Sequence, residues 1–495
     1  MALFTPSQRA ALRHPVRWLT DRNPGEPGEI PRRELVNYTL GLTGQNQLYN
    51  MAGGRFFHFC TNVLMIDAVT VGKMTGAITV FDALNDPVAG ALIDNHRFRD
   101  GRKLLPWIRL TSPPIAVLAF LLFLNWSLPT QGMKVLYCVV VYVLWDVLYS
   151  FQDASLWGMT AAISPLSSQR ARATQWADIG AMLGGLLPGL LTPMLSGDGA
   201  FGLSQQQWYL IFAAAMCLGG GTLAMASLGT VERVRSLPGE EKSVWKNIGA
   251  LRYNYVLLLF LASEVLKSCA PNVNDMYIYQ QMSYRVADKV IPATVLVTVL
   301  GALTGLPGTA AKFFATKLAE RAGGMKRILL ITCFAGIAVR LLQYFVGIST
   351  LPRFVLMYLI DVVYGLPSGI NNIAMRTMIS DSVEYVEWKT GERTEGITMS
   401  VRNLMSKLSG AIQKYIQGYC LHFLQFDAEL VQANRPQNAH FQKWIWPMFR
   451  LGPVVGLVLS LVPLLVLKYP DSLKAKVESE MAQRRKAAEE LEKVT

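Results

Sequence analysis

Charged residues are scarce in this chain of 495 residues, since Asp, Glu, Lys and Arg together make up 16% of it. A typical soluble domain has about 25%. Hydrophobic residues make up 52%, so the composition excludes an ordinary soluble protein and indicates one embedded in a lipid bilayer. Apolar runs near the ~20 residues that a spanning helix needs recur along the chain, which favours helical spans.

Cysteine and histidine are also rare, and neither is arranged as a redox or metal site. The six cysteines stand singly with no CxxC pair, so we expect reduced packing residues. The five histidines have no metal-ligand spacing, which argues against a polytopic membrane enzyme built on a metal cluster. We therefore predict that the protein is not an enzyme and needs no cofactor beyond a coupling ion.

The amino-terminal segment lacks the continuous apolar core of a cleavable signal peptide. Residues 1–35 instead carry several arginines and prolines, which predicts a basic cytoplasmic tail. The net charge of +13 comes from short loops and tails beside apolar runs, so we predict no nucleic-acid partner.

Twelve spans are predicted from the length of the apolar runs and from the Gly, Pro and charged residues that separate them. An amino-terminal bundle at 36–230 holds the spans 36–66, 75–94, 107–128, 133–161, 173–196 and 206–230. After a cytoplasmic linker at 231–251, a carboxy-terminal bundle at 252–468 holds the spans 252–281, 290–315, 327–348, 353–377, 396–425 and 444–468. A charged cytoplasmic tail at 469–495 ends the chain.

Loop charges predict the orientation. The connections on the linker side hold far more Lys and Arg than those on the opposite side, so the linker and both termini are expected to be cytoplasmic. We predict a multi-pass protein of the plasma (inner) membrane, surrounded by lipid and monomeric.

Two carboxylates stand four residues apart inside the second span. On a helix Asp82 and Asp86 share one face, with Asn85 beside them. An ionised group at the membrane centre costs roughly 2.5–3.5 kcal/mol on insertion scales, so both need compensation. Their oxygens suit Na⁺, and a proton could instead titrate one of the neighbouring carboxylates. We predict a cation site at Asp82, Asn85 and Asp86; an ion pair with Arg or Lys on another helix is the alternative.

Polar residues in the first and fourth spans suit a hydroxyl-rich ligand. Gln45, Asn46 and Asn50 form an amide strip, which alternatively supplies helix–helix hydrogen bonds. In the fourth span Asp153 and Trp157 share one face, preceded by Gln152. A carboxylate that accepts sugar hydroxyls beside an indole that stacks on the ring is a common sugar site, although the Trp alternatively serves in packing. We predict substrate contacts from all six residues.

The second half also has charged residues inside its spans. Glu264 and Lys267 are three apart and are expected to pair with each other. Arg340, Asp361 and Arg376 are candidates for interhelix pairs. Lys407 lies deep in the eleventh span, where an ammonium needs an anionic partner. We predict that it pairs with the second-span carboxylates and couples cation occupancy to closure of the two bundles.

Three sequence stretches resemble one family. They are Asp82-Ala83-Leu84-Asn85-Asp86-Pro87-Val88-Ala89-Gly90 with Arg102–Trp107, the segment Asp153–Trp157, and the loop Asp381–Ile397. All three are similar to the glycoside-pentoside-hexuronide:cation symporters of the major facilitator superfamily. The resemblance implies an all-α integral membrane fold, with twelve transmembrane helices in two pseudo-symmetric six-helix bundles.

That resemblance implies roles for individual residues. Asp82 and Asp86 would bind Na⁺, Li⁺ or H⁺, Asp153 and Trp157 would contact the sugar, and Lys407 would lie between the two sites. Melibiose-type members have Lys-Asp where this chain has Gln45-Asn46, and an arginine where it has Thr79. The cation motif is therefore intact while the predicted sugar pocket is altered.

The predicted function is cation-coupled symport of a sugar or glycoside by alternating access, with a pentoside, hexuronide or oligosaccharide as cargo and Na⁺ or H⁺ as driving ion. The alternatives are a symporter of a non-sugar solute such as a lysolipid and a non-transporting sensor on the same fold.

Overall fold

The computed structural model describes the helical body of the chain: residues 29–96, 102–164, 167–196, 203–233, 254–274, 276–279, 282–286, 289–293, 315–390, 395–433 and 435–467, with isolated positions near 98, 296–311 and 476–483. The chain packs into two compact units. Met1–Met74, Phe81–Glu240 and Gln432–Asn434 form the first, and Thr75–Val80, Glu241–Val431 and Arg435–Thr495 form the second.

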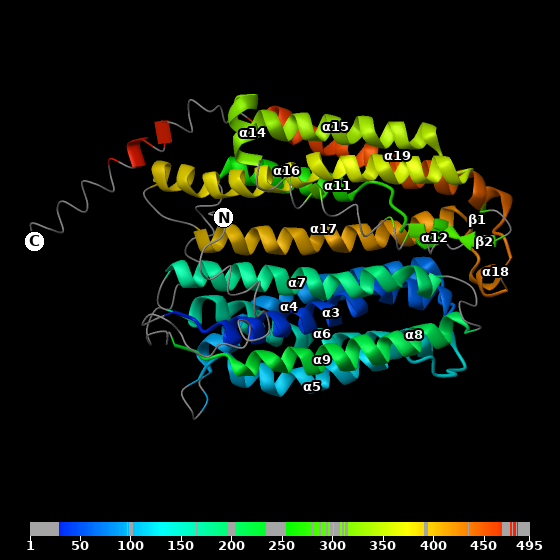
Figure 1. The fold of residues 1–495 in the computed structure, drawn as a ribbon, viewed down its shortest axis with the longest axis horizontal. Coiled ribbons are helices and arrows are strands. Elements are labelled where there is room, and N and C mark those ends of the chain that lie inside the picture. Colours follow the sequence, from blue (N-terminus) through cyan, green and yellow to red (C-terminus); the bar gives the residue numbers. More distant parts are fainter. Residues whose placement is uncertain are drawn as a thin grey trace, which may run out of the picture. The chain divides into compact units, whose positions relative to one another are not determined.

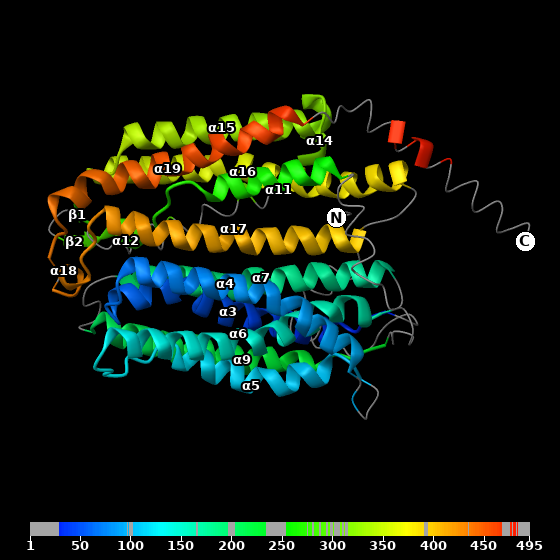
Figure 2. The ribbon, with the colours of Figure 1, turned by 180° about the vertical axis from the view of Figure 1, so that it is seen from behind.

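The helices of the first unit run alongside one another (Figures 1 and 2). They are α3 (Arg32–Asn62), α4 (Ala68–Asn95, apart from Thr75–Val80), α5 (Leu105–Leu121), α6 (Gln131–Ala162), α7 (Ser167–Ser196), and the sixth span. The sixth span is made of α8 (Gln205–Ala213), the π-helical turn η2 (Ala214–Leu218), α9 (Gly219–Ala224) and the 3₁₀ turn η3 (Met225–Gly229). Side-chain caps begin α4 and α6, where Asp67 and Thr130 accept from backbone N–H groups. The six spans predicted in this half are confirmed as helices.

Small residues let α3 lie in close contact with two neighbours. A Cβ on Gly44 would collide with the carbonyl oxygen of Gly220 on α9, and one on Gly184 of α7 would collide with the carbonyl oxygen of Thr43. Close backbone approach through glycine is typical of membrane helix pairs. It makes α3 an inner helix, with buried residues along much of its length.

Glu232 and Arg233, which follow η3, form hydrogen bonds with the ends of three helices. The carboxylate of Glu232 accepts from the backbone N–H groups of Lys103 (2.9 Å), Leu104 (2.9 Å) and Leu105 (2.6 Å), which caps the start of α5. Arg233 donates twice to Glu34 on α3, at 2.7 and 2.9 Å, and once to the Ile163 carbonyl after α6. The hydrogen bonds that Arg233 donates to Glu34 raise the pKa of the guanidinium, so this cation stays charged.

The described part of the second unit begins with the helices α11 and α12 and a short β-hairpin, and the longer helices follow. Its elements are α11 (Tyr255–Ser268), α12 (Met276–Tyr279), β1 (Ser283–Val286), β2 (Lys289–Pro292), α14 (Ala315–Ala322), α15 (Met325–Val346), α16 (Leu351–Thr390), α17 (Glu395–Phe423), α18 (Ala428–Gln432) and α19 (Ala439–Val466). The strands pair antiparallel, with Ser283 opposite Pro292 and Val286 opposite Lys289.

Three predicted boundaries in this half were wrong. The seventh span, expected at 252–281, ends as a helix at Ser268 and is followed by Pro271, whose ring has no backbone N–H for a continuing helix. The eighth span was expected to start at 290, but β2 occupies 289–292, and the rest of that span lies largely outside the described residues. The tenth helix, α16, continues well past the expected end at 377.

Most of the basic amino-terminal tail (1–35), most of the linker (231–251) and most of the charged tail (469–495) likewise lie outside the described residues. The predictions for these segments stay predictions.

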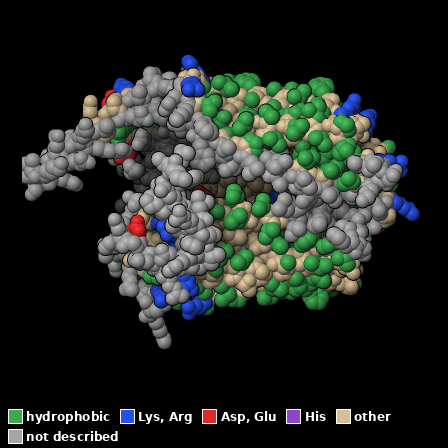
Figure 3. Space-filling view, viewed as in Figure 1, with side chains coloured by type: hydrophobic (Ala, Val, Ile, Leu, Met, Phe, Trp, Pro, Cys, Tyr) green, Lys and Arg blue, Asp and Glu red, His purple; other side chains and the backbone are tan. Residues whose placement is uncertain are grey.

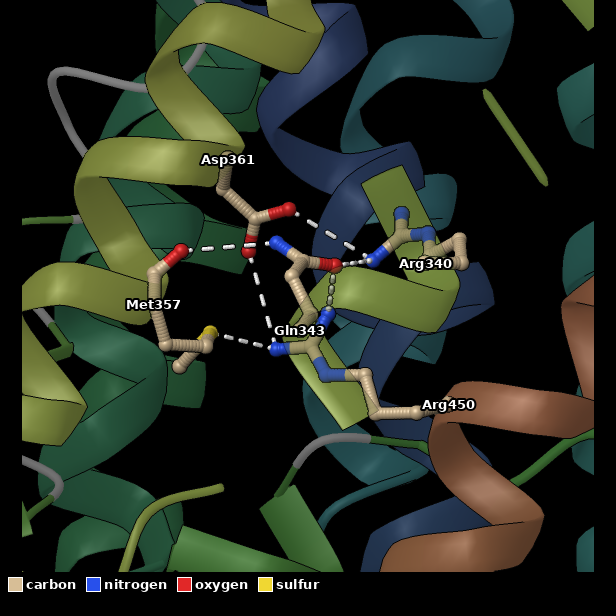
Figure 4. Close-up of polar contacts among 5 residues, drawn as sticks. All are labelled: Arg340, Gln343, Met357, Asp361 and Arg450. Atoms are coloured by element: carbon tan, nitrogen blue, oxygen red, sulfur yellow. Dashed lines mark hydrogen bonds and ion pairs between the residues drawn. The ribbon is translucent and has the colours of Figure 1, made fainter. Parts of the chain in front are cut away.

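A charged network lies inside the second unit (Figure 4). Arg340 on α15 and Arg450 on α19 both pair with Asp361 on α16, at 3.5 and 3.6 Å, so two of the three candidates for interhelix pairs, Arg340 and Asp361, pair with each other. The side chain of the third candidate, Arg376, lies outside the described residues. Both guanidiniums also donate to Oε1 of Gln343, at 3.1 and 2.9 Å. Arg450 is 1% exposed and lies 4.5 Å from the ring centroid of Phe449. The network therefore joins three helices through one carboxylate and two cations.

The outer surfaces of the helices suit a lipid environment. Hydrophobic side chains cover their length, with Lys and Arg toward their ends (Figure 3). In the part of the chain that the structure describes, five helical segments are long and apolar enough by themselves to cross a membrane: Gln131–Thr160, Gln205–Gly229, Met325–Val346, Leu351–Asn372 and Ala439–Val466. α3, α4 and α17, which carry most of the predicted site residues, are more polar because these side chains interrupt their apolar runs.

Candidate functional site

Gln45 connects the first and fourth spans. Its side chain is 1% exposed, and Nε2 donates one hydrogen bond to Asp153 Oδ1 at 2.5 Å and another to the hydroxyl of Tyr149, both on α6. Its Oε1 accepts from Asn46 Nδ2 at 2.7 Å. Both hydrogens of the amide are thus directed at α6, and three predicted substrate residues, Gln45, Asn46 and Asp153, lie together.

This arrangement orients a carboxylate for binding hydroxyl groups. A carboxylate has about four lone-pair sites, and Gln45 occupies one of those on half-buried Asp153. Hydrogen bonds to an ionised acceptor are stronger than neutral ones. A carboxylate held in this way is suited to accepting from neighbouring sugar hydroxyls, and the side-chain oxygen of Asn46 adds a further acceptor.

Tyr149 lies at the centre of this region and was not predicted from the sequence. Its ring stacks between Trp145, at 4.9 Å between centroids, and Tyr49, at 5.6 Å. Asp153, Asp82 and Asp86 are all near enough to interact electrostatically with its hydroxyl. Tyr149 stands four residues before Asp153, so the i, i+4 spacing on one helical face was a signal that could have identified it.

The predicted cation residues occupy the inner side of α4. Leu84, Val88 and Leu92 expose one face of this helix, whereas Ala89 is buried and Asp82 and Asp86 are half-buried. Asn85 donates to Ser150 Oγ on α6 at 3.0 Å, and that hydroxyl donates to the Asp146 carbonyl at 3.1 Å. Asn85 is therefore held through its nitrogen, and its Oδ1 remains the atom suited to a cation.

Pro87 leaves the carbonyl oxygen of Ala83, in the same turn, as a further oxygen ligand for a cation. It lies inside α4 and has no N–H, so it cannot supply the hydrogen bond that the Ala83 carbonyl would receive in a regular helix. Within the described part of the chain, no group of three or more His, Cys, Asp or Glu side chains could hold a metal ion. A cation here would depend on two carboxylates with amide or carbonyl oxygens, a donor set that suits a monovalent ion.

Trp157 is half-buried against an apolar cluster that includes Tyr38, Ile108 and Leu156. One part of the indole therefore contributes to packing, which was the alternative considered from the sequence. Its role as a stacking surface for a sugar stays a prediction.

Two other predicted substrate residues, Gln152 and Asn50, have no hydrogen bond to the side chains of Gln45 or Asp153 among the contacts described. Gln152 is fully buried and donates to Ser112 Oγ on α5 at 2.7 Å, so it faces the α5–α6 contact. Asn50 donates to the Asn46 carbonyl one turn earlier in α3, at 2.8 Å. Lys407 lies half-buried on α17 in the second unit, and its pairing with Asp82 and Asp86 stays a prediction.

Known proteins share this sequence pattern and fold. A family profile described as MFS/sugar transport protein matches residues 37–471. The isoprimeverose transporter of Lactiplantibacillus pentosus is 23% identical over 461 residues, which cover 92% of each protein. The lactose permease of Lactobacillus delbrueckii subsp. bulgaricus is 29% identical over 77% of this chain and 61% of that protein.

Among solved structures, a variant of the nucleoside transporter NupG has a TM-score of 0.60 with 14% identity, covering 88% of this chain and all of that one. This likeness shows the fold alone. The family match extends over most of the chain and includes every residue of the predicted cation and substrate sites. The chain is therefore a multi-pass membrane transporter and not an enzyme, and it belongs to the MFS/sugar transport proteins, within the glycoside-pentoside-hexuronide:cation symporters of the major facilitator superfamily.

Proposed function

We propose that this protein couples the downhill entry of Na⁺ or H⁺ to the uptake of a sugar or glycoside by alternating access. The observation that carries the proposal is the Gln45–Asp153 hydrogen bond of 2.5 Å beside Tyr149, with Asp82 and Asp86 in electrostatic range of the same hydroxyl. The names of the relatives support a sugar as cargo, since those proteins are described as transporters of isoprimeverose and lactose.

Electrostatics gives a reason for coupling. Asp82, Asp86 and Asp153 are three carboxylates near one hydroxyl, and like charges in a low-dielectric interior repel one another. A cation on Asp82 and Asp86 would neutralise part of this charge and so favour a sugar whose hydroxyls Asp153 accepts. The sugar would then favour cation binding by the same factor, because coupling between two ligands is reciprocal.

The cation would take oxygen from Asp82, Asp86 and Asn85, with the Ala83 carbonyl available in the turn that Pro87 opens. Asp153, Gln45 and Asn46 would hold the sugar, with Trp157 beneath the ring. Lys407 would respond to cation occupancy. We place the protein in the plasma membrane as a monomer with cytoplasmic termini, in line with its loop charges.

The test is counterflow and uptake in proteoliposomes of the full chain. A panel of pentosides, hexuronides and neutral glycosides, each with and without an imposed Na⁺ or pH gradient, identifies cargo and driving ion together. We expect at least one sugar to show counterflow and to accumulate only under one of the gradients. A lysolipid taken up in place of every sugar, or binding without counterflow as in a sensor, would contradict the proposal.

A further inference from the structure

A polar cavity of about 270 Å³ lies within the second unit, among α11, α15, α16, α17 and α19. It is slightly smaller than the ~300–1,000 Å³ typical of small-molecule sites, which suits a ligand of one ring. Its lining includes Glu264 and Lys267 from α11, Asn371 and Asn372 from α16, and Arg402 from α17. None of the predicted substrate residues contributes to it.

The charges that line this cavity are not paired with one another. Glu264 and Lys267 were expected to pair, but no ion pair joins them, and Arg402 makes none among the described residues. The expected pair was wrong because side chains three apart on a helix can pair but need not, and here both border the cavity. Two cations and one carboxylate therefore line this cavity, with Glu264 and Arg402 half-buried and Lys267 exposed. Charges within a membrane-spanning bundle are unfavourable unless they are compensated.

The neutral part of the lining suits hydroxyl groups. Asn371 Nδ2 donates to Thr332 Oγ1 at 2.9 Å and to Cys333 Sγ at 3.5 Å, so its hydrogens are used within the protein and its Oδ1 can act as an acceptor. Ser263 donates to the Ser460 carbonyl at 2.8 Å, so its oxygen can still accept. Together with Glu264, the lining offers acceptors for hydroxyl groups beside two cationic donors.

We propose that this cavity binds an acidic sugar, a uronic acid or uronide, with Lys267 and Arg402 holding its carboxylate and Glu264 and Asn371 accepting from its hydroxyls. The inference rests on the proposed sugar-transport function and specifies the class of sugar. Among the described lining residues there are two cations and one carboxylate, so a ligand with one carboxylate brings their summed charge to zero. A neutral sugar leaves one cation uncompensated, and a phosphate dianion leaves one excess negative charge. The planar guanidinium of Arg402 matches a carboxylate in a two-point geometry.

The experiment compares two ligands that differ in the carboxylate. Binding of p-nitrophenyl β-D-glucuronide and p-nitrophenyl β-D-glucoside to the purified full chain is measured by calorimetry, and the corresponding galacto pair is measured in the same way. We expect the uronide of at least one pair to bind about tenfold or more tightly than its neutral partner. The reason is that only the uronide has a carboxylate that can accept hydrogen bonds from Lys267 and Arg402, and hydrogen bonds to charged groups are stronger than neutral ones.

Variants separate this cavity from general effects of charge. Arg402→Gln and Lys267→Gln should each reduce the uronide preference about tenfold, and the charge-conserving Lys267→Arg should retain part of it. Glu264→Gln should increase the preference, because it removes the negative charge. The control Arg353→Gln removes an exposed arginine of α16 that bonds Ser349, and it should leave the preference unchanged.

Equal affinities within both pairs would overturn the inference, as would a preference that survives Arg402→Gln and Lys267→Gln or falls with Glu264→Gln. Neutral glycosides that are transported without any preference for uronides would leave the proposed function standing while this inference fails. Failure of every sugar in counterflow would instead contradict the proposed function.

Discussion

Gln45 Nε2 on α3 donates to Asp153 Oδ1 on α6 at 2.5 Å, so one amide fixes the position of the carboxylate best suited to bind a sugar. Both hydrogens of that amide are used, one on Asp153 and one on the Tyr149 hydroxyl. The site is therefore preorganised by a neutral residue. An amide here orients Asp153 without adding a further negative charge beside it.

Replacing Gln45 by Met should weaken sugar binding about tenfold, because Asp153 and Tyr149 lose the donor that positions them. The change keeps the length of the side chain, so packing is disturbed little. The control is Thr43→Val on the same helix, which removes only a hydrogen bond to the Thr39 carbonyl. Dissociation constants from calorimetry measure the effect. Equal losses in both variants would show that Gln45 acts through packing alone.

The Arg340–Asp361–Arg450 network predicts a non-additive pair of variants. Asp361→Asn removes the carboxylate that both guanidiniums pair with and should destabilise the protein by up to about 3 kcal/mol, the lower end for breaking a buried pair because Asp361 is 19% exposed. Adding Arg340→Gln removes one excess cation and should restore part of the loss. Thermal unfolding in detergent gives the comparison. A double variant as unstable as the two single losses combined would contradict this interpretation.

The contact between α3 and α9 predicts opposite effects for two glycines of one helix. Gly44→Ala places a methyl group against the Gly220 carbonyl and should cost about 1–3 kcal/mol by overpacking. At Gly54 nothing lies within 4 Å of a new Cβ, so Gly54→Ala should be neutral or stabilising by up to about 1 kcal/mol. Unfolding temperatures of the two variants should therefore move apart, and a common shift would argue against the close contact.

Removing the Glu232 carboxylate after η3 should destabilise the start of α5. Glu232→Ala leaves the first backbone N–H groups of α5 without their carboxylate and should destabilise the protein by roughly 1–3 kcal/mol. Arg233→Gln should cost less, because the pair with Glu34 is partly exposed. Glu429→Ala, at an exposed position, serves as the control. Hydrogen exchange at Lys103, Leu104 and Leu105 should accelerate in Glu232→Ala, and unchanged protection there would refute the cap.

Local patterns predicted much of this structure. Apolar length located the six spans of the first unit, and the spacing of the polar residues predicted that Asp82, Asn85 and Asp86 share one face of α4. The burial pattern then shows which side of the helix that face is on. The β-hairpin at 283–292 was missed because Val290, Ile291 and Pro292 continue directly into an apolar run that resembles a helix. Short apolar segments do not distinguish a strand from a helix by periodicity.

Hydrogen bonds and ion pairs between helices were harder to predict than which residues share a face of one helix. The sequence marked Gln45 and Asp153 as substrate residues, but their direct hydrogen bond depends on how α3 and α6 pack. Gln152, adjacent to Asp153, turns toward Ser112 because neighbouring helical positions differ by about 100° in direction. Arg450, a cation in an apolar stretch of α19, has a partner on α16 that no local spacing could reveal.

The most direct test of cation coupling is sugar transport by Asp82→Asn in proteoliposomes, with counterflow and gradient-driven accumulation measured on the same preparation. The account predicts that accumulation under a Na⁺ or proton gradient is lost, because one of the two carboxylates for the cation is gone, while counterflow through Gln45 and Asp153 persists. Accumulation that continues unchanged in Asp82→Asn would contradict it.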